Sequence, residues 1–587
     1  MAETLISPGV LARENDISFI APAPVEAGAA FIGPTVLGPV EEPTVVTSYG
    51  QYQRVFGTTF ESGSNKYEFM TSLAVKSYFN QGGNSALITR VVSGSFTRAG
   101  STHVTASAVS AKPFALETLG KGFIYNGALS ADPADMSLNS DGSLSSGSAD
   151  NIRWEISNVD NSAGTFSLIV RRGDDSTKNK IILETFNDLS LDPNSGNYIE
   201  KVVGNQYNSK TTDGDGSIYI KTVGEYVNRS KYVRISAVNT PTLNYLGTDG
   251  VSVNVDSNDV SYSGSLPTAG QSGSFFGATG KNYPDNRKAL YFEDISNTDS
   301  QGLVGANYAD SISILGNKDE YVFNIISAPG LIYDYGTHKT QLDSIISLAE
   351  TRGDCISVVD LEQYGATVSN VVAAASTVNS SYAAGYWPWL QTASSTGKNV
   401  WIPASVVIPG VYAFTDGAAA PWFAPAGLTR GGISDVIQAE RKLTRTQRDT
   451  LYKSNINPIA TFPGAGISVF GQKTLQKKSS ALDRVNVRRL LIALKKFIGD
   501  VSRTLVFEQN TNVTRNNFLS QVNPFLESVV QRQGLFAFRV VMDETNNSAD
   551  VIDRNQLIGQ IFIQPAKTVE FIVLDFTVEP TGASFGG

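Results

Sequence analysis

The chain is organised around residues 483–510, DRVNVRRLLIALKKFIGDVSRTLVFEQN. At about 100° per residue, many of its apolar side chains share one arc, which predicts a helix that packs on a core. These side chains are Val487, Leu490, Leu491, Leu494, Phe497 and Ile498. The cations lie outside the arc, interrupted by Val485 and Ile492: Arg484, Arg488 and Lys495 on one side, Arg489 and Lys496 further round. We therefore expect a buried side and a basic side.

Positive charge is concentrated around this helix. From Arg430 to Lys496 there are 14 Lys/Arg and 4 Asp/Glu, a net charge of +10, whereas the whole chain carries −9 and its remainder therefore −19. A basic segment in an acidic protein indicates an acidic partner, and a solvated helix face without a partner stays an open alternative. Because the chain is acidic overall and aromatic residues do not interleave with the cations, we do not expect nucleic acid binding.

The sequence around the helix predicts a C-terminal α+β domain over residues 431–568, with a terminal arm over 569–587. Helical runs are expected at 431–456 and 514–534, separated by the Pro/Gly loop FPGAGISVFGQKTL at 462–475. Strands are expected at 536–543, 558–566 and 569–578. In the last of these, Ile572, Leu574, Phe576 and Val578 form a wholly apolar face, which an unpaired strand could not leave exposed.

Upstream, two patterns alternate along the chain. Residues 23–95 and 311–430 read as strands and helices in turn, which predicts parallel crossovers and one discontinuous α/β core domain. Residues 96–310 hold short β-branched runs separated by polar turns, which predicts two inserted antiparallel β domains, 96–200 and 201–310. Residues 1–22 contain too few apolar residues to form a core alone, so a frayed terminus is one interpretation of them; the resemblance described below implies an extended arm instead. The fold class is thus α/β and α+β multidomain, with extended terminal arms.

The residues that chemistry needs are sparse. The two histidines, His103 and His338, have no second His or Cys at metal-ligand spacing. A triad of Ser327, His338 and Asp343 lacks a nucleophile-elbow motif, and Cys355 is expected in a buried strand. TTDGDGSIYIK at 211–221 has glycine where a calcium loop needs its last acidic ligand, so a hairpin is favoured. We therefore expect that the protein is not an enzyme and that it binds neither a cofactor nor a metal.

No apolar run approaches the length of a membrane-spanning helix, and the N-terminus lacks the pattern of a signal peptide. We therefore expect that the protein does not insert into a membrane and that it assembles in a cytoplasm.

Several ordered motifs resemble the tail sheath proteins of contractile-tailed bacteriophages. In the basic region these are FPGAGISVFGQKTL, VNVRRLLIALKKFI, LVFEQNT and FLESVVQRQG. Upstream they are SPGVLARE at 7–14, AAFIGPTVLGPVEEPTVVTSYGQYQRVFG at 29–57, SLAVKSYFNQGGNSALITRVV at 72–92 and IPASVVIPGVYAFTDGAAAPWFAPAG at 402–427. The matching blocks cover about half of the chain.

The resemblance implies a structural virion protein, assembled in the host cytoplasm as hexameric rings around an inner tube. Its partners would be other copies of itself, the tail tube protein, and baseplate and tail terminator proteins; contraction would drive the tube through the host envelope. The resemblance also implies that the insertions project outward. The sheath of a bacterial contractile injection system or tailocin is a close alternative. A multidomain hydrolase or carbohydrate-binding protein is an alternative of another class.

The resemblance also assigns roles to residues. The basic surface of Arg484, Arg488, Arg489, Lys495 and Lys496 would face the tube. The terminal arms would add strands to neighbouring subunits. The arm residues are Ile17, Phe19 and Ile20 at the N-terminus, and Phe571, Ile572, Val573, Leu574 and Phe576 at the C-terminus.

Overall fold

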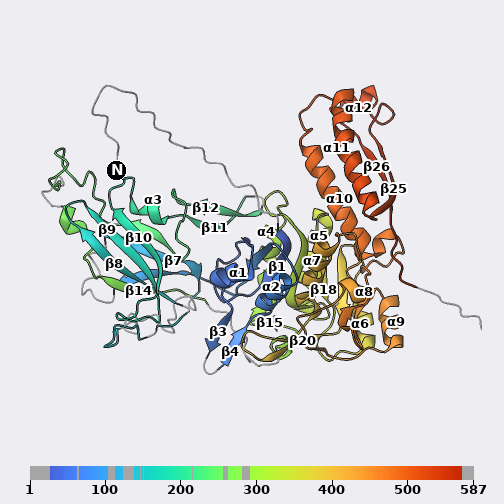
Figure 1. The fold of residues 1–587 in the computed structure, drawn as a ribbon, viewed down its shortest axis with the longest axis horizontal. Helices are drawn as coiled ribbons and strands as arrows, with labels where there is room; N and C mark the ends of the chain where they lie inside the picture. The colour runs from blue at the N-terminus through green and yellow to red at the C-terminus, as the bar shows by residue number, and fades with distance from the viewer. Residues whose placement is uncertain are drawn as a thin grey trace, which may run out of the picture.

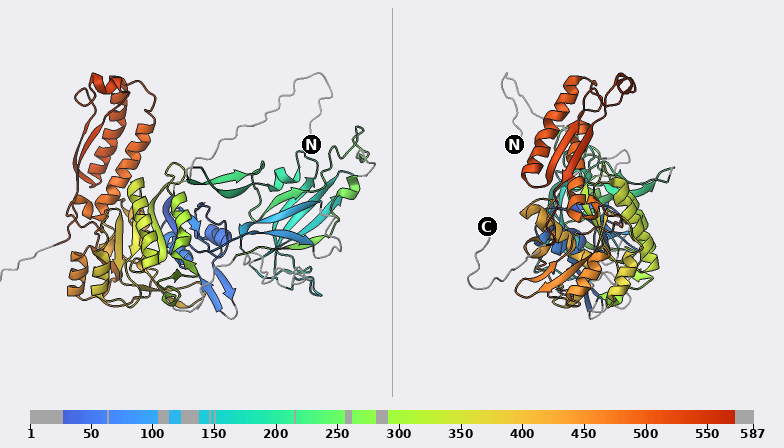
Figure 2. Two further views of the ribbon diagram at one scale, coloured as in Figure 1. Left: turned by 180° about the vertical axis from the view of Figure 1, so that it is seen from behind. Right: turned by 90° about the vertical axis from the view of Figure 1, so that its right-hand side faces the viewer.

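The computed structural model of the chain describes residues 27–62, 65–103, 113–122, 138–145, 147–149, 151–214, 216–255, 262–280 and 291–571. It is a mixed α/β protein with two large sheets and a helical C-terminal part (Figure 1). Views from behind and from the side show that the C-terminal part rises from one end of the eight-stranded sheet, away from the seven-stranded sheet (Figure 2).

The eight-stranded sheet has the order β2-β5-β1-β17-β18-β19-β23-β24. Its interior pairs are parallel, while the outer pairs β2–β5 and β23–β24 are antiparallel. The strands are β1 (Ala27–Gly33), β2 (Thr44–Val46), β5 (Ala86–Arg90), β17 (Phe323–Ile332), β18 (Ile356–Asp360), β19 (Ala383–Trp387), β23 (Ile456–Phe462) and β24 (Gly466–Val469).

Helices cover both faces of this sheet because its strands are apolar on both sides. In β1, Phe31 faces a cluster that includes α1 (Tyr49–Phe56), α2 (Met70–Asn80) and α7 (Ile408–Ala418). Its neighbour Ile32 faces the opposite cluster. That cluster is built with α5 (Gly336–Arg352), α6 (Val368–Ala375) and α9 (Arg445–Lys453). The sheet is therefore the middle layer of an α/β/α arrangement.

The seven-stranded sheet is antiparallel throughout, in the order β10-β9-β8-β14-β6-β7-β13. Its strands are β6 (Arg98–His103), β7 (Phe114–Lys121), β8 (Ile152–Asp160), β9 (Thr165–Arg172), β10 (Ile182–Ser190), β13 (Val233–Val238) and β14 (Ser272–Phe276). A short helix, α3 (Ile199–Val203), packs into its apolar cluster. Because β13 and β14 pair with strands from before residue 200, the predicted boundary between two inserted domains does not separate two sheets.

The segment 211–221 forms a hairpin, as predicted, from β11 (Tyr207–Thr212) and β12 (Ile218–Val223). The hairpin is tied to the eight-stranded part by Lys210. Its Nζ lies 2.6 Å from Glu41 Oε2 and 2.6 Å from Asp310 Oδ2. Two carboxylates from distant parts of the chain thus share one cation and link the hairpin to the core.

Small elements complete this half of the molecule. They are the hairpins β3 (Thr59–Ser62) with β4 (Asn65–Glu68) and β15 (Asp299–Ser300) with β16 (Leu303–Val304), the sheet of β20 (Leu390–Ala393), β21 (Asn399–Ile402) and β22 (Gln438–Ala439), and the helices α4 (Ala309–Ile314) and α8 (Gly427–Arg430).

The C-terminal part contains two long helices and a two-stranded sheet. Its elements are α10 (Val485–Arg503), α11 (Asn512–Gln531), β25 (Leu535–Val541), α12 (Ala549–Asp553) and β26 (Gln560–Pro565). Leu490 and Leu494 of α10 pack with Phe518 and Val522 of α11 in one apolar cluster. The predicted boundary at 430/431 lies too early in the chain, because β23 and β24 belong to the eight-stranded sheet.

The helical run predicted at 431–456 is also only partly correct. The helix α9 begins at Arg445, because Thr444 accepts a hydrogen bond from the Gln447 backbone N–H in a capping box. Residues before Thr444 form the short strand β22 and irregular segments. The basic residues of this stretch therefore do not lie on one continuous helix.

Candidate interaction site

The basic residues of α10 do not share one surface. Arg488 is 4% exposed, and burial lowers the pKa of its guanidinium. Its Nε donates to the Ser381 carbonyl oxygen at 3.2 Å, and its guanidinium carbon lies 3.9 Å from the centroid of the Tyr382 ring. Arg488 thus joins α10 to the loop before β19, and its buried position contradicts the prediction of an outward basic face.

Arg489 is also buried, at 3% exposure. Its Nη2 donates to Asp416 Oδ2 at 2.6 Å, and its guanidinium carbon lies 4.6 Å from the centroid of the Tyr412 ring. Both partners belong to α7. The pair therefore fastens α10 to a helix of the core layer, which again contradicts the predicted role.

The other three cations are more accessible. Arg484 makes a bidentate pair with Glu570, at 2.7 Å from Nε and 3.0 Å from Nη2. Lys495 is exposed and its Nζ lies 3.3 Å from the Tyr382 hydroxyl, while Lys496 is half-buried. The basic surface is reduced in this chain to the two lysines.

The reason is that α10 is buried on two sides. Val485 and Ile492, which seemed to interrupt a polar face, pack into the cluster of the eight-stranded sheet. Leu490 and Leu494 pack into the C-terminal cluster. The arginines lie between these two apolar contacts, where their stems are covered and their charged ends meet Ser381 and Asp416.

Most of the predicted arm residues lie outside the described residues: Ile17, Phe19, Ile20, Ile572, Val573, Leu574 and Phe576. Phe571 is described and is 79% exposed. Residues 569–571 are not in a strand of this single chain. Up to Phe571, the predicted strand at 569–578 therefore has no partner strand within the described part of the molecule.

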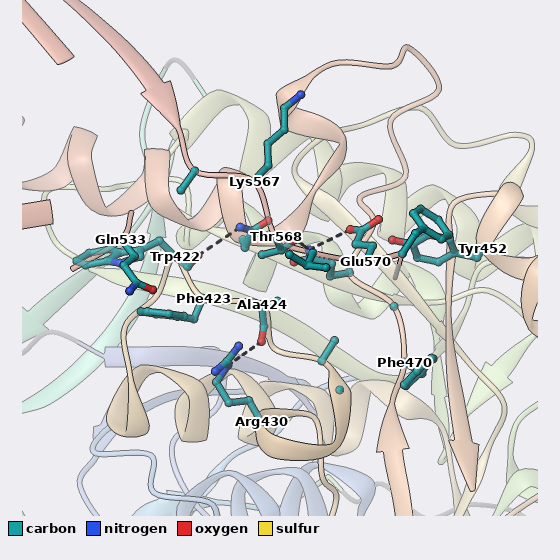
Figure 3. Close-up of a pocket in the computed structure, with 18 of the residues that line it drawn as sticks. Trp422, Phe423, Ala424, Arg430, Tyr452, Phe470, Gln533, Lys567, Thr568 and Glu570 are labelled. Carbon is teal, nitrogen blue, oxygen red and sulfur yellow. Dashed lines mark hydrogen bonds between the residues drawn. The ribbon is translucent and has the colours of Figure 1, made fainter. Parts of the chain in front are cut away.

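A groove lies between the C-terminal part and the core layer (Figure 3). Its volume is about 1050 Å³. Aromatic side chains, arginines and the final described segment line it. They include Trp422, Phe423, Arg430, Arg445, Arg448, Tyr452, Phe470, Gln472, Gln533, Leu535, Phe536 and residues 566–571.

The arginines of the groove face aromatic rings. The guanidinium carbon of Arg430 lies 5.1 Å from the Phe423 ring centroid, and that of Arg448 lies 5.5 Å from that of Phe470. Within the described ranges, no ion pair is formed by Arg430, Arg448 or Arg445. Cations beside apolar rings suit a polypeptide segment that carries both apolar and acidic side chains.

The sheet of β25 and β26 lies next to this groove. Both strands have an outer edge that pairs with no other strand in the described part of the chain. Phe536 and Phe562 are exposed on these strands. Free edges and exposed aromatic rings together form a surface on which another strand can dock.

Sequence reasoning missed the arginines of the groove, although a signal was present. The capping box at Thr444 starts a helix at Arg445. Spacings of three, four and seven residues then place Arg445, Arg448, Asp449 and Tyr452 on one helix face. All four line the groove.

The carboxyl end of the parallel sheet, where α/β enzymes bind substrates, offers no triad. The Ser327 hydroxyl donates to the Ser405 carbonyl oxygen at 3.2 Å, and Asp343 accepts from the Tyr333 hydroxyl at 2.8 Å. His338 is buried, its Nδ1 accepts from the Ile332 backbone N–H at 3.3 Å, and burial lowers its pKa to about 4. The three side chains thus bond to different partners.

Asp360 is the most perturbed carboxyl at this end. It is buried at the end of β18, accepts from the Ser405 backbone N–H at 2.9 Å and also bonds the Ser405 hydroxyl. Burial raises the pKa of Asp360 to about 7.

In the part of the chain that the structure describes, no group of three or more His, Cys, Asp or Glu side chains is placed to hold a metal. None of the helices described there is long and apolar enough to span a membrane.

Residues 301–475 match the family model described as the phage tail sheath protein central domain, and residues 477–579 match that of the phage tail sheath C-terminal domain. Residues 301–475 and 477–579 thus carry the central and C-terminal domains of the phage tail sheath family. The boundary between the two matches follows β24, in agreement with the end of the eight-stranded sheet.

Two phage proteins illustrate this similarity. The chain is 43% identical over 188 residues to the tail sheath protein of Vibrio phage KVP40, and 40% identical over 187 residues to that of Enterobacteria phage T4. Each match covers 32% of this chain and 28% of the relative's length. A solved sheath tail protein from Listeria innocua is similar in fold, with a TM-score of 0.52 at 10% identity, covering 92% of this chain and 96% of that one.

The pair between buried Arg489 and half-buried Asp416 yields a first prediction. Arg489→Ala should lower the free energy of unfolding by about 1.5–3 kcal/mol, because a charged hydrogen bond to Asp416 is lost. Urea unfolding followed by tryptophan fluorescence measures the change. The control is the exposed Lys495→Ala, with an expected effect within about 0.5 kcal/mol. Equal effects of the two variants would contradict a fastening role for Arg489.

Asp360 yields a second prediction, on pH. Its folded pKa of about 7 lies above the ordinary 3.8, so the folded state binds the proton more tightly than the unfolded state. The stability due to this group is present below about pH 4 and is lost as the pH rises towards 7. Asp360→Asn should flatten the fall of stability between these values in thermal unfolding. Asp449→Asn, on an exposed helix position, is the control; an unchanged slope in Asp360→Asn contradicts the assignment.

Proposed function

We propose that this chain is a structural subunit of a contractile phage tail sheath, and that its copies join by exchanging strands. The proposal is carried by the sheet of β25 and β26, whose two outer edges pair with no strand among the described residues and which lies beside residues 566–571 in the lining of the groove. The matches to the two phage tail sheath domains support the same conclusion.

Strand addition explains features that a single chain leaves unsatisfied. A two-stranded sheet alone is marginally stable, and free edges expose a row of backbone donors and acceptors. A strand from a neighbour supplies those hydrogen bonds, and its alternate side chains cover exposed rings such as Phe562. We propose that the N-terminal arm (Ile17, Phe19, Ile20) and the C-terminal arm (Phe571, Ile572, Val573, Leu574, Phe576) supply these strands.

On this proposal the copies form hexameric rings stacked helically around the tail tube, within a virion assembled in the host cytoplasm. Baseplate and tail terminator proteins would bind the two ends. Contraction needs no catalysis, because its energy comes from better packing between subunits in the contracted state. Arms with a continuous backbone would keep subunits linked while their rigid parts shift.

The tube contact must be revised from the sequence prediction. With Arg488 and Arg489 buried and Arg484 paired with Glu570, the exposed member of the predicted basic surface is Lys495, and Lys496 beside it is half-buried. Exposed ion pairs contribute about 0–1 kcal/mol each. Weak contacts of this size suit a sheath that must release its tube.

Removing the C-terminal arm tests the proposal. A chain that ends at Phe571 should stay folded, because the described core is intact, but should lose the ability to form tubular polymers or rings. Negative-stain electron microscopy and sedimentation velocity of the purified protein at high concentration measure this. The matched control is Val251→Ser, which replaces a side chain 78% exposed in the inserted part. Polymers of the shortened chain equal to those of the full chain would overturn strand exchange by this arm.

A further inference from the structure

The loop between α10 and α11 exposes an apolar tip. Phe507 is fully exposed, at 100%, and its neighbour Val506 is exposed too. Val513, in the first turn of α11, adds a third exposed apolar side chain. An aromatic ring without any cover is costly in water, so this tip, defined as Val506, Phe507 and Val513, indicates a contact surface.

The backbone of the tip is strained. Phe507 has a φ of +74°, in the left-handed region that bulky side chains rarely adopt. Such a conformation costs on the order of 1–3 kcal/mol and persists where the surroundings impose it. Here the strain holds a phenylalanine in solvent, where it gains nothing within the chain.

The surroundings that impose it are hydrogen bonds on the C-terminal side of the loop. Thr514 Oγ1 donates to the Gln509 carbonyl oxygen at 2.6 Å, and the buried Arg515 donates from Nε to Asn510 Oδ1 at 3.0 Å. Asn510 Nδ2 in turn donates to the Gln556 carbonyl oxygen at 2.8 Å, beside α12. The loop is thus held in place, and an anchor held in place loses little conformational entropy when it binds.

The groove lies at the opposite end of the same helix. The tip precedes α11, while Val530 and Gln533, at and after its last turn, line the groove. A helix of 20 residues is about 30 Å long, so the tip cannot reach the groove of its own chain. Figure 1 shows α11 running from the α12 end of the C-terminal part back towards the core.

The two surfaces are chemically complementary. The tip carries Glu508, exposed, directly after Phe507. The groove carries the rings of Phe423 and Phe470 together with arginines that lack an ion pair in the described ranges, Arg445 and Arg448 among them. Its volume, about 1050 Å³, is at the top of the range of about 300–1,000 Å³ typical of ligand pockets.

We propose that the tip of one copy inserts into the groove of a second copy, with Phe507 between the aromatic rings and Glu508 beside Arg445 and Arg448. The contact is heterologous, because tip and groove are different surfaces, and such contacts build rings or open helical polymers rather than closed dimers. The inference rests on the proposed function in that the chain polymerises. It adds a contact separate from the exchanged strands. A second copy is favoured over the tube because both halves of the contact are present on this chain.

Disulfide trapping tests the contact. The native cysteine, Cys355, is buried, so introduced cysteines supply the accessible thiols. Full-length chains with Glu508→Cys and with Arg445→Cys are purified separately, mixed, mildly oxidised and analysed on non-reducing gels. We expect a linked dimer in the mixture and in neither preparation alone. The control mixture pairs Val251→Cys with Arg445→Cys.

The outcomes separate the contact from polymerisation itself. Polymers seen by electron microscopy without the 508–445 link overturn the tip contact and leave the sheath proposal standing. Absence of both polymers and link overturns both.

A second variant measures the energy of the anchor. Phe507→Ser should fold normally, since the ring contacts nothing, and should raise the concentration at which polymers form by at least tenfold, as loss of a buried aromatic anchor does. Val251→Ser again serves as the control. Normal polymers of Phe507→Ser that no longer bind tube protein would overturn the proposal in favour of a tube contact.

Discussion

The parallel pairing of β1 between β5 and β17 is the constraint on which the rest of the fold depends. Ala29 pairs with Ala86 on one side and with Ile325 on the other, across nearly 300 residues of sequence. Parallel neighbours cannot be joined by tight turns, so the chain must leave the sheet and return. The seven-stranded sheet occupies this excursion, and the core layer is complete only when both halves of the chain have arrived.

Helix α10 connects the C-terminal part to the eight-stranded sheet. One set of its apolar residues packs on the eight-stranded layer and another on α11. Between the two, buried Arg489 adds an ion pair with the half-buried Asp416 of α7. The C-terminal part is therefore coupled to the core through this helix and through the bond from Trp422 Nε1 to the Arg532 carbonyl oxygen. Its own small sheet has outer edges that pair with no strand among the described residues. In a sheath, the core and the helices of the C-terminal part would move as one rigid body. Strands added to the small sheet would keep neighbouring subunits connected during that movement.

Much of the fold could be predicted from periodicity. The strand–helix alternation predicted a parallel layer assembled from two distant segments, and Phe31 and Ile32 indeed face opposite clusters. The pairing of β13 and β14 with earlier strands could not be predicted, because alternating polar and apolar residues specify a face but not a partner. For the same reason the sequence did not reveal that β23 extends the core sheet.

The candidate site was harder to predict than the fold. A helix with arginines opposite an apolar arc is normally basic towards solvent, and only the tertiary contacts of Ser381 and Asp416 show that Arg488 and Arg489 are buried. The groove draws residues from Trp422 to Phe571, a span of sequence that no local motif connects. Its helical portion alone had a readable signal, in the capping box at Thr444.

We propose that copies of this chain are joined by strands added to the sheet of β25 and β26. A cryo-electron microscopy reconstruction of polymers grown from the full-length protein tests this linkage most directly. We expect density for added strands along both outer edges of this sheet, continuous with the terminal arms of neighbouring copies. A polymer in which these edges stay unpaired, and in which the arms return to their own subunit, would contradict it.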